Sequence, residues 1–399
     1  MLDIARELSR WCARGRDFAV ATVVAADGSV PRPPGAALAV DTDGTATGSV
    51  SGGCVEAAVY ELCHQALSTG ETLLERFGSD ESDPFAAGLA CGGTIDVLVT
   101  PVRAGTPGTD RAAATFTAAL TAAARGEPVA IVRSLDGPGS LRGQALLVRT
   151  DGSHRGSLGG DDRLDRAAAR EAHALLTAGR TATVRIGADG TRCEPAITLL
   201  IETTARPARM VVFGAIDFAA ALVRVGTFLG YHLTVCDARS VFATRERFPQ
   251  ADEVVVDWPH RYLDSQRLDA RAVLCVLTHD AKFDVPLLER ALRLPVAYVG
   301  AMGSRRTHHE RLRRLREAGL TEPELARLRS PIGLDLGART PEETALSIAS
   351  EIVAERHGGT GLPLTGTRNP IHRDPPPPRS RRPDDAGTSR GRGRARAFG

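Results

Sequence analysis

Residues 48–56 read GSVSGGCVE, and they separate a strand-like run at residues 36–40 from a helix-like run at residues 55–67. Glycine adopts backbone conformations that other residues avoid, and it lets the main chain come close to a bound molecule. The first amides of a helix are also unpaired and available to a ligand. The stretch therefore predicts a strand-loop-helix unit whose loop approaches a ligand.

The residues on either side extend this loop into a small α+β unit. Apolar residues at 4, 8, 11 and 12 have a helical spacing, and short β-type runs lie before and after the loop. The expected strands cover residues 19–25, 36–41, 72–77 and 95–100. A Cys-Gly-Gly sequence at residues 91–93 precedes the last of them.

A second copy of this pattern follows about 108 residues later. Three pairs align: residues 36–44 with 144–152, Gly48-Ser-Val with Gly156-Ser-Leu, and the helix-ending Gly70 with Gly179 at an offset of 109. Such self-similarity indicates an internal duplication of a β-β-α-β unit. The second copy has Asp161 or Asp162 where the first has Cys54, and it has no Cys-Gly-Gly sequence. We therefore expect the first copy to hold the site and the second to act as scaffold.

The C-terminal half has a different pattern. Short apolar runs at residues 210–213, 233–236, 253–256, 273–277 and 296–299 alternate with helix-like stretches or loops. This alternation predicts a parallel sheet with helices on both faces, a doubly wound domain of the Rossmann type. We expect an N-terminal domain at 1–103, a degenerate repeat with a linker at 104–206, the Rossmann-like domain at 207–357 and a tail at 358–399.

The composition is that of a globular protein, with 42% hydrophobic and 25% charged residues. No run approaches the ~18 apolar residues of a membrane span, and the N-terminal residues lack the layout of a signal peptide. We expect a cytoplasmic protein without membrane association. The seven cysteines form no CxxC pair, which favours free thiols over disulfides or zinc.

The last 32 residues carry nine arginines against three aspartates, a net charge of +6 out of the total of +2, so the rest of the chain is at about −4. With four consecutive prolines and GRGRAR near its end, this basic tail is expected to be disordered. Aromatic residues make up only 4% of the chain and do not alternate with arginines in the folded part, so nucleic-acid binding is not expected.

Ligands of a doubly wound sheet bind beyond the carboxyl ends of its strands. The candidate residues in those loops are Gly214, Asp237, Thr278, His279, Asp280, Gly300 and Gly303. The first loop, GAIDFA, has Ile216 where a GxGxxG motif has its second glycine, so NAD(P) binding is not expected. Asp237 lies 23 residues after Gly214, close to the ~20 expected for a ribose-binding acid, or it caps a turn.

Ser304, Arg305 and Arg306 precede an amphipathic helix. Ser304 is expected to cap that helix, and two arginines beside its free amides suit a phosphate. The alternative is a solvated first turn, although positive charge is mildly unfavourable at a helix N-terminus. Thr340 and Glu343 form a capping box for a last helix at residues 341–356, which is a structural feature.

Cys54 is the main candidate for chemistry. It is expected in the first turn of a helix beside a glycine nest, where a thiolate is favoured. The residues expected to approach the ligand with it are Ser51, Gly52, Gly53, Glu56, Cys91, Gly92 and Gly93. Glu56 also suits a helix N-terminus for dipole reasons alone. Cysteines 63, 236 and 275 lie in apolar runs and are expected to be buried.

Six motifs together resemble the XdhC/CoxI family, the accessory factors of xanthine dehydrogenase and of carbon monoxide dehydrogenase-type molybdenum enzymes. They are GSVPRPPG (28–35), GSVSGGCVE (48–56), LACGGTIDVLV (89–99), LTHDAKFD (277–284), YVGAMGSRRT (298–307) and SPIGLDLGARTPEETALSIASEI (330–352). The resemblance runs in order from about residue 10 to 357. At GAIDFA the chain departs from the GAGxxA sequence of many relatives.

The resemblance implies a molybdenum cofactor (molybdopterin) carrier rather than a catalyst. Such a chaperone protects the cofactor while a cysteine desulfurase supplies the sulfido ligand, then inserts it into the apo-molybdoenzyme. It implies that glycine amides and the pair Arg305/Arg306 hold the molybdopterin phosphate, that Cys54 lies near molybdenum as a soft ligand, and that the protein is a homo-oligomer. The alternative is an NAD(P)-dependent oxidoreductase that uses Asp237 for ribose and His279 as acid or base.

Overall fold

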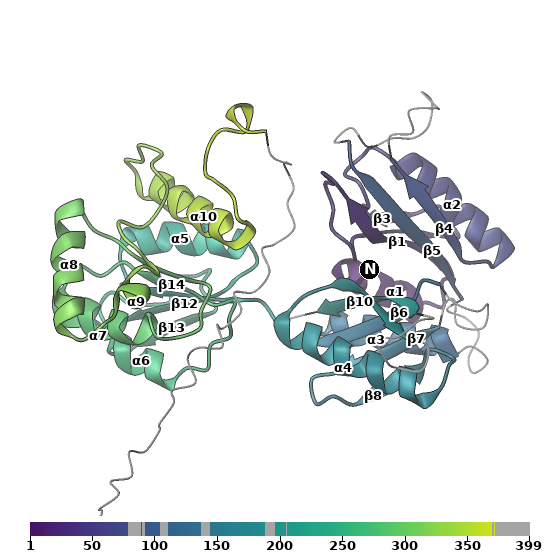
Figure 1. Ribbon diagram of the computed structural model, residues 1–399, viewed down its shortest axis with the longest axis horizontal. Coiled ribbons are helices and arrows are strands. Elements are labelled where there is room, and N and C mark those ends of the chain that lie inside the picture. Colours follow the sequence, from purple (N-terminus) through teal and green to yellow (C-terminus); the bar gives the residue numbers. More distant parts are fainter. Residues whose placement is uncertain are drawn as a thin grey trace, which may run out of the picture.

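The computed structural model describes residues 1–78, 89, 92–103, 111–136, 144–187, 196–204, 206–368 and 371. The chain folds into two bodies, which are joined where β10 (Ala196–Thr204) leads into β11 (Arg209–Phe213) (Figure 1). Most of the tail for which disorder is expected, residues 372–399, lies outside the described residues.

The first unit of the N-terminal body is an antiparallel sheet with strand order β3-β2-β1-β5-β4. Its elements are η1 (Leu2–Ile4), α1 (Ala5–Ala13), β1 (Phe18–Asp27), β2 (Ala37–Asp41), β3 (Ala46–Gly48), α2 (Glu56–Thr69), β4 (Leu73–Phe77) and β5 (Thr94–Val102). The expected helices and strands are present, and the short edge strand β3 is an addition that the sequence pattern did not show.

The second unit repeats this arrangement, with strand order β8-β7-β6-β10-β9. Its elements are α3 (Arg111–Ala124), β6 (Val129–Ser134), β7 (Ala145–Arg149), β8 (His154–Ser157), α4 (Asp162–Ala178), β9 (Ala182–Gly187) and β10. Each position in the strand order of the first sheet has its counterpart in the second. The duplication that the sequence indicates is therefore also present in the fold.

Matching glycines show how closely the two copies agree. Gly48 has a φ of +86°, and a Cβ placed on it would lie 2.1 Å from the carbonyl oxygen of Ala37. Gly156 has a φ of +95°, and its Cβ would lie 2.4 Å from the carbonyl oxygen of Ala145. Only glycine fits this close approach between neighbouring strands. The same packing demand thus explains why glycine occupies this position in both copies.

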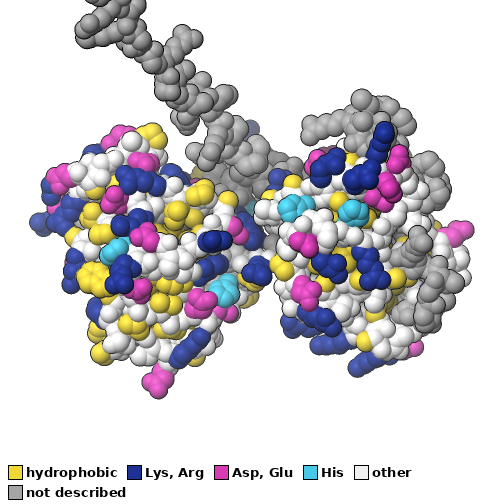
Figure 2. Space-filling model, turned by 90° about the horizontal axis from the view of Figure 1, so that it is seen from below, with side chains coloured by type: hydrophobic (Ala, Val, Ile, Leu, Met, Phe, Trp, Pro, Cys, Tyr) yellow, Lys and Arg dark blue, Asp and Glu magenta, His cyan; other side chains and the backbone are white. Residues whose placement is uncertain are grey.

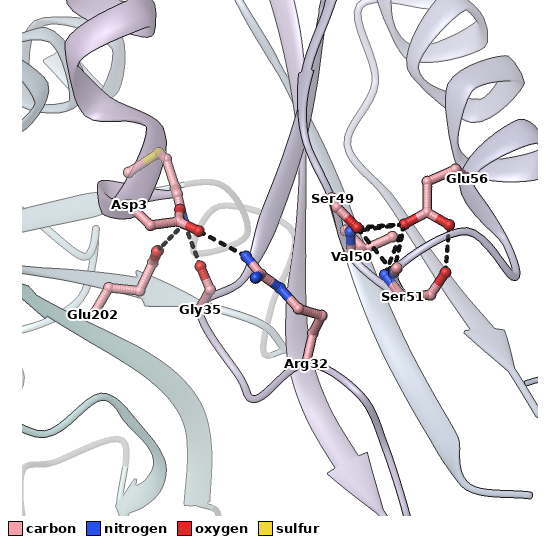
Figure 3. Close-up of polar contacts among 10 residues, drawn as sticks. Asp3, Arg32, Gly35, Ser49, Val50, Ser51, Glu56 and Glu202 are labelled. Carbon is pink, nitrogen blue, oxygen red and sulfur yellow. Dashed lines mark hydrogen bonds and ion pairs between the residues drawn. The ribbon is translucent and has the colours of Figure 1, made fainter. Parts of the chain in front are cut away.

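The two units share one core. A cluster of buried residues from α1 and α3 packs between the inner faces of the two sheets, whereas α2 covers the outer face of the first sheet and α4 that of the second. Buried charges reinforce the junction: Glu202 accepts hydrogen bonds from Arg133 and from the amino group of Met1, both at 2.6 Å (Figure 3). These groups lower the pKa of Glu202 although burial alone would raise it.

The C-terminal body is a parallel six-stranded sheet with order β13-β12-β11-β14-β15-β16. Its strands are β11, β12 (His232–Asp237), β13 (Glu253–Val256), β14 (Val273–Val276), β15 (Tyr298–Ala301) and β16 (Leu328–Arg329). The Rossmann-like fold expected from the sequence is confirmed. The fifth strand begins at Tyr298 rather than at residue 296, and the two-residue β16 has no pattern of its own in the sequence.

Helices cover both faces of this sheet (Figure 1). They are α5 (Asp217–Phe228), α6 (Pro259–Ser265), α7 (Ala281–Ala291), α8 (Arg305–Glu317), α9 (Glu322–Leu325) and α10 (Pro341–His357), with the turn η2 (Leu364–Gly366) beyond them. Helices α5 and α10 pack on one face, and α6, α7 and α8 on the other. The expected capping box of Thr340 and Glu343 starts α10.

Among the described residues, no helix combines the length and apolar character that a bilayer crossing requires. On the face drawn in Figure 2, acidic and basic side chains are intermingled over both bodies. That face therefore presents no broad surface of one charge.

Candidate functional site

The GSVSGGCVE loop is held by the carboxylate of its last residue, Glu56, which lies in the first turn of α2 (Figure 3). One oxygen, Oε1, accepts hydrogen bonds from Ser49 Oγ (2.6 Å) and from the amides of Val50 (3.2 Å), Ser51 (2.9 Å) and Gly52 (3.0 Å). The other, Oε2, accepts from the amide of Gly53 (2.7 Å) and from Ser51 Oγ. The loop thus wraps around its own anion.

This arrangement sets the charge state of Glu56. Burial alone would raise its pKa, but the hydrogen bonds from Ser49, Ser51 and Gly53 outweigh burial and lower the pKa to about 2. Glu56 is therefore a carboxylate at neutral pH. Because it already occupies the amides of residues 50–53, those amides are not open to an external anion in this conformation, and Glu56 acts as the support of the loop.

What the loop leaves exposed is the thiol of Cys54. Gly52 and Gly53 beside it are also exposed, and a Cβ added at either would meet no atom within 4 Å. A ligand can therefore approach the backbone here and reach the sulfur. The loop presents one soft nucleophilic atom on a rigid, glycine-lined surface.

The second copy contains the same device without the thiol. Asp165 is buried, and its Oδ1 accepts a hydrogen bond from the amide of Leu158 at 2.9 Å, as Glu56 does from Val50. Leu158 follows Val50 by 108 residues and Asp165 follows Glu56 by 109. The loop carboxylate is thus common to both copies, whereas Cys54 is present in one. Sequence alignment at 108 missed this pair because the match needs the neighbouring offset; an acid in the first helical turn was the available signal.

The Cys-Gly-Gly sequence can be followed in part, because Cys91 lies outside the described residues. Gly93 packs against the GSVPRPPG motif: a Cβ placed on it would lie 2.4 Å from the carbonyl oxygen of Ser29. Gly92 and Gly28 lie at the same junction, since a Cβ on Gly28 would be 3.4 Å from Cα of Gly93. Close packing of two loops thus accounts for Gly93.

At the carboxyl edge of the Rossmann-like sheet, Asp237 at the end of β12 has its oxygens in use. Oδ2 accepts from the amide of Ala215 at 2.8 Å, and Arg239 donates to both oxygens through Nε (2.9 Å) and Nη2 (2.7 Å). Burial would raise the pKa of Asp237, but these hydrogen bonds lower it. The amide after Gly214, on which a pyrophosphate would rest in a dinucleotide-binding turn, is therefore already paired.

On the other side of the switch point between β11 and β14, a buried polar cluster anchors the loops. Thr278 donates to Asp284, and Arg311 Nη2 donates to Asp284 Oδ2 at 2.9 Å and to the carbonyl of Met302 at 2.8 Å. Arg311 Nη1 reaches Ser330 Oγ at 2.9 Å. Burial dominates here and raises the pKa of Asp284 despite Arg311. This cluster fixes α7 and α8 against the ends of β14 and β15.

A cavity of about 270 Å³ lies above that cluster. Its lining consists of His279, Ala281, Asp284, Val285, Arg306, Thr307, Glu310, Arg311 and Arg314. Two residues that the sequence singled out, His279 and Arg306, therefore face one space. Arg306 has no ion-pair partner among the described residues, whereas Arg314 pairs with Glu310 at 3.0 Å. The cavity is an anion site in its charge balance.

The other predicted residues of this edge have structural contacts. Ser304 caps α8 as expected, accepting from the amide of Thr307 at 3.1 Å. Asp280 caps α7 and pairs with Lys282 at 3.0 Å. Gly300 lies inside β15 against Ile332, which leaves no room for a Cβ. Gly303 and Arg305 border α8 without lining the cavity.

The two groups of candidate residues belong to different bodies (Figure 1). Within the described chain, the hydrogen bonds of residues 48–56 all stay in the N-terminal body. The Cys54 loop and the Arg306 cavity are therefore two separate sites in this conformation.

Comparison with known proteins follows the same division. A model described as the XdhC and CoxI family matches residues 11–78 and 122–187, and a model described as the XdhC Rossmann domain matches residues 210–352. Together the two models match more than half of the chain.

Three relatives have names. The uncharacterized protein YqeB of Escherichia coli K12 is 30% identical over 261 residues, which are 62% of this chain and 47% of YqeB. The molybdenum cofactor insertion chaperone PaoD of the same organism is 26% identical over 86% of this chain and 84% of PaoD. A Bacillus subtilis 168 protein, named as a probable subunit of xanthine dehydrogenase, is 25% identical over 84% of this chain and 92% of its own length. The chain thus spans about half the length of YqeB and most of the other two.

A solved structure has the same fold. The crystal structure of a protein from Bacillus halodurans, described as a xanthine dehydrogenase, matches 88% of this chain and 95% of its own with a TM-score of 0.64 and 24% identity. The family models cover both copies of the duplicated unit and the Rossmann-like domain, and they include the Cys54 loop and the Arg306 cavity. The chain belongs to the XdhC and CoxI family.

Proposed function

We propose that this protein is a molybdenum cofactor carrier, which holds the cofactor during sulfuration and inserts it into an apo-molybdoenzyme of the xanthine dehydrogenase type. The observation that carries the proposal is the exposed thiol of Cys54 on a loop that Glu56 holds rigid, present in one copy of a duplicated unit and absent from the other. The name of PaoD, a molybdenum cofactor insertion chaperone, supports the same cargo.

The Arg306 cavity is proposed to hold the phosphate end of molybdopterin. Its volume of about 270 Å³ is below the ~300–1,000 Å³ of pockets that enclose a whole drug-sized ligand, so it suits one end of the cofactor. Arg306 supplies an unpaired positive charge, and the first amides of α8 point the same way as its dipole. His279 on the opposite wall adds a second donor.

Cys54 is proposed to contact the molybdenum end, since a thiolate is a soft ligand for a metal of this kind. The rigid loop keeps the sulfur accessible to the cargo and to a cysteine desulfurase. Because Cys54 and Arg306 lie in different bodies, the proposal assigns them separate duties: Arg306 retains the pterin, and Cys54 preserves the sulfurated metal. A homo-oligomer in the cytoplasm, delivering to the apo-enzyme, completes the proposal.

The two duties can be tested with separate readouts. Protein purified from cells that make molybdopterin is assayed for molybdenum, for pterin and for its ability to activate an apo-molybdoenzyme. Arg306→Ala is expected to lose about tenfold or more of the bound pterin, because a charge-assisted phosphate contact is removed. Cys54→Ala is expected to keep pterin but to lose activation of the client.

Matched controls keep the result specific. Arg305→Ala removes the neighbouring exposed arginine, which does not line the cavity, and should retain pterin. Cys12→Ala removes another thiol, half-buried on α1, and should leave activation unchanged. Tight NAD(P) binding by wild type, with no bound pterin or molybdenum, would overturn the proposal in favour of an oxidoreductase.

A further inference from the structure

A second cavity at the carboxyl edge of the sheet has a different character. It measures about 170 Å³ and lies over the ends of β11 and β12, lined by Ala215, Ile216, Asp217, Arg239, Phe242 and Arg247. None of these residues lines the Arg306 cavity. Phe242 is 40% exposed although it follows a strand of the domain core. An aromatic ring left open beside a cavity is available to a ligand.

Two guanidinium groups flank this ring. The guanidinium carbon of Arg239 lies 4.7 Å from the ring centroid of Phe242, and that of Arg247 lies 5.5 Å from it. The salt bridge to buried Asp237 fixes Arg239. Phenylalanine and arginine both offer flat faces on which a nucleobase stacks. The cavity therefore has the form of a platform for a planar heteroaromatic ring.

The neighbouring turn does not accept a pyrophosphate. Asp237 occupies the amide of Ala215, the side chain of Ile216 stands where close approach needs glycine, and the carboxylate of Asp217 lies in the first turn of α5. A diphosphate that followed the usual route over this helix N-terminus would be repelled. A ligand of the platform must therefore carry its phosphate elsewhere.

Arg247 offers that alternative. Its Nη2 contacts Asp217 at 3.1 Å, and its Nη1 contacts the carbonyl of Ala215 at 3.3 Å. Both side chains of the Arg247–Asp217 pair are solvent-exposed, and exposed ion pairs contribute little, so Arg247 can exchange this partner for a phosphate. The pair of Arg239 with Asp237, whose carboxylate is buried, stays in place.

We propose that this cavity binds a nucleoside 5′-monophosphate, with the base stacked on Phe242 and the phosphate on Arg247. The site lies beside the Arg306 cavity, since Asp280 of the loop after β14 raises the pKa of Arg239 through its charge, after the hydrogen bond to Asp237. It is independent of the cofactor proposal, because it uses different residues and is measured without any molybdenum or pterin.

The test is calorimetric titration of the full-length protein with AMP, GMP, CMP and UMP. At least one monophosphate is expected to bind saturably below about 1 mM. Phe242→Ala should weaken that binding about tenfold or more, Phe242→Trp should retain it, and inorganic phosphate alone should bind much more weakly. Arg247→Ala should weaken the monophosphate but leave the affinity for the corresponding nucleoside unchanged.

Phe228→Ala is the matched control, because Phe228 is 87% exposed at the end of α5 in the same domain and lies outside the cavity. It should bind as wild type does. The proposal is overturned if no monophosphate binds wild type saturably, or if Phe242→Ala binds as tightly as wild type. It is also overturned if NAD⁺ binds more tightly than AMP, since the turn would then accept a pyrophosphate.

Discussion

Replacing Glu56 with glutamine keeps the shape of the side chain but removes the negative charge at the centre of the GSVSGGCVE loop. Four backbone amides and two hydroxyl groups of residues 49–53 donate to the Glu56 carboxylate. A glutamine has one carbonyl oxygen to accept some of these, and its amide group faces donors. The variant should therefore loosen the loop that presents Cys54 while leaving the sheet beneath it intact.

The pKa shift gives the size of the effect. The pKa of Glu56 falls from 4.5 to about 2, and at about 1.36 kcal/mol per unit this corresponds to roughly 3 kcal/mol. Because the carboxylate is only partly buried, solvent screening reduces the expected loss to ~1–2 kcal/mol. The folded-state pKa is the lower one, so this stabilisation is complete above pH 4.5 and disappears as the pH falls from 4.5 toward 2.

Hydrogen exchange at the amides of Ser51, Gly52 and Gly53 measures this loop directly, without assuming that the two bodies unfold together. Glu56→Gln should accelerate their exchange roughly 5- to 30-fold at neutral pH. Glu61→Gln, an exposed acid on the same helix, is the control and should exchange as wild type does. Equal protection in Glu56→Gln and wild type, or equal acceleration in Glu61→Gln, would refute the role assigned to Glu56.

Two further predictions concern stability. Gly48→Ala and Gly156→Ala should both destabilise the N-terminal body well beyond Gly126→Ala, because the new methyl groups would lie 2.1 and 2.4 Å from carbonyl oxygens, whereas Gly126 has the same left-handed backbone with open space and should lose ~1–2 kcal/mol; thermal unfolding with similar losses in all three variants would contradict the packing argument. Arg311→Ala should destabilise the C-terminal body by ~3–5 kcal/mol by leaving Asp284 buried without its partner. Because burial already raises the pKa of Asp284, that loss should be smaller at pH 5 than at pH 8, and Arg311→Met with Asp284→Asn should recover part of it; chemical denaturation at both pH values checks this, and a pH-independent loss would count against it.

The sequence was sufficient for the architecture wherever a repeating pattern carried it. Apolar runs alternating with helical stretches identified the Rossmann-like sheet, and the offset of 108 residues between Gly48 and Gly156 identified the duplicated unit. Short elements such as β3 and β16 were missed, because two or three residues at a sheet edge hold no periodicity.

The site was harder to predict, because a glycine-rich loop before a helix looks the same whether its amides are free or filled. Glu56 fills them from four positions beyond Gly52, and only the three-dimensional contacts show it. Asp237 is a similar case: its spacing from Gly214 suggested ribose, whereas its oxygens bind Ala215 and Arg239. Cys54 stayed the candidate throughout, since its exposure follows from the open glycines beside it.

The central claim is that this chain carries molybdenum cofactor, and the most direct test is the molybdenum and pterin content of the native protein purified from molybdate-supplied cells. We predict that wild type contains molybdenum and pterin in equal amounts, that Arg306→Ala has lost most of both, and that Arg305→Ala has kept them. Wild-type protein with no more molybdenum or pterin than Arg306→Ala would contradict the account.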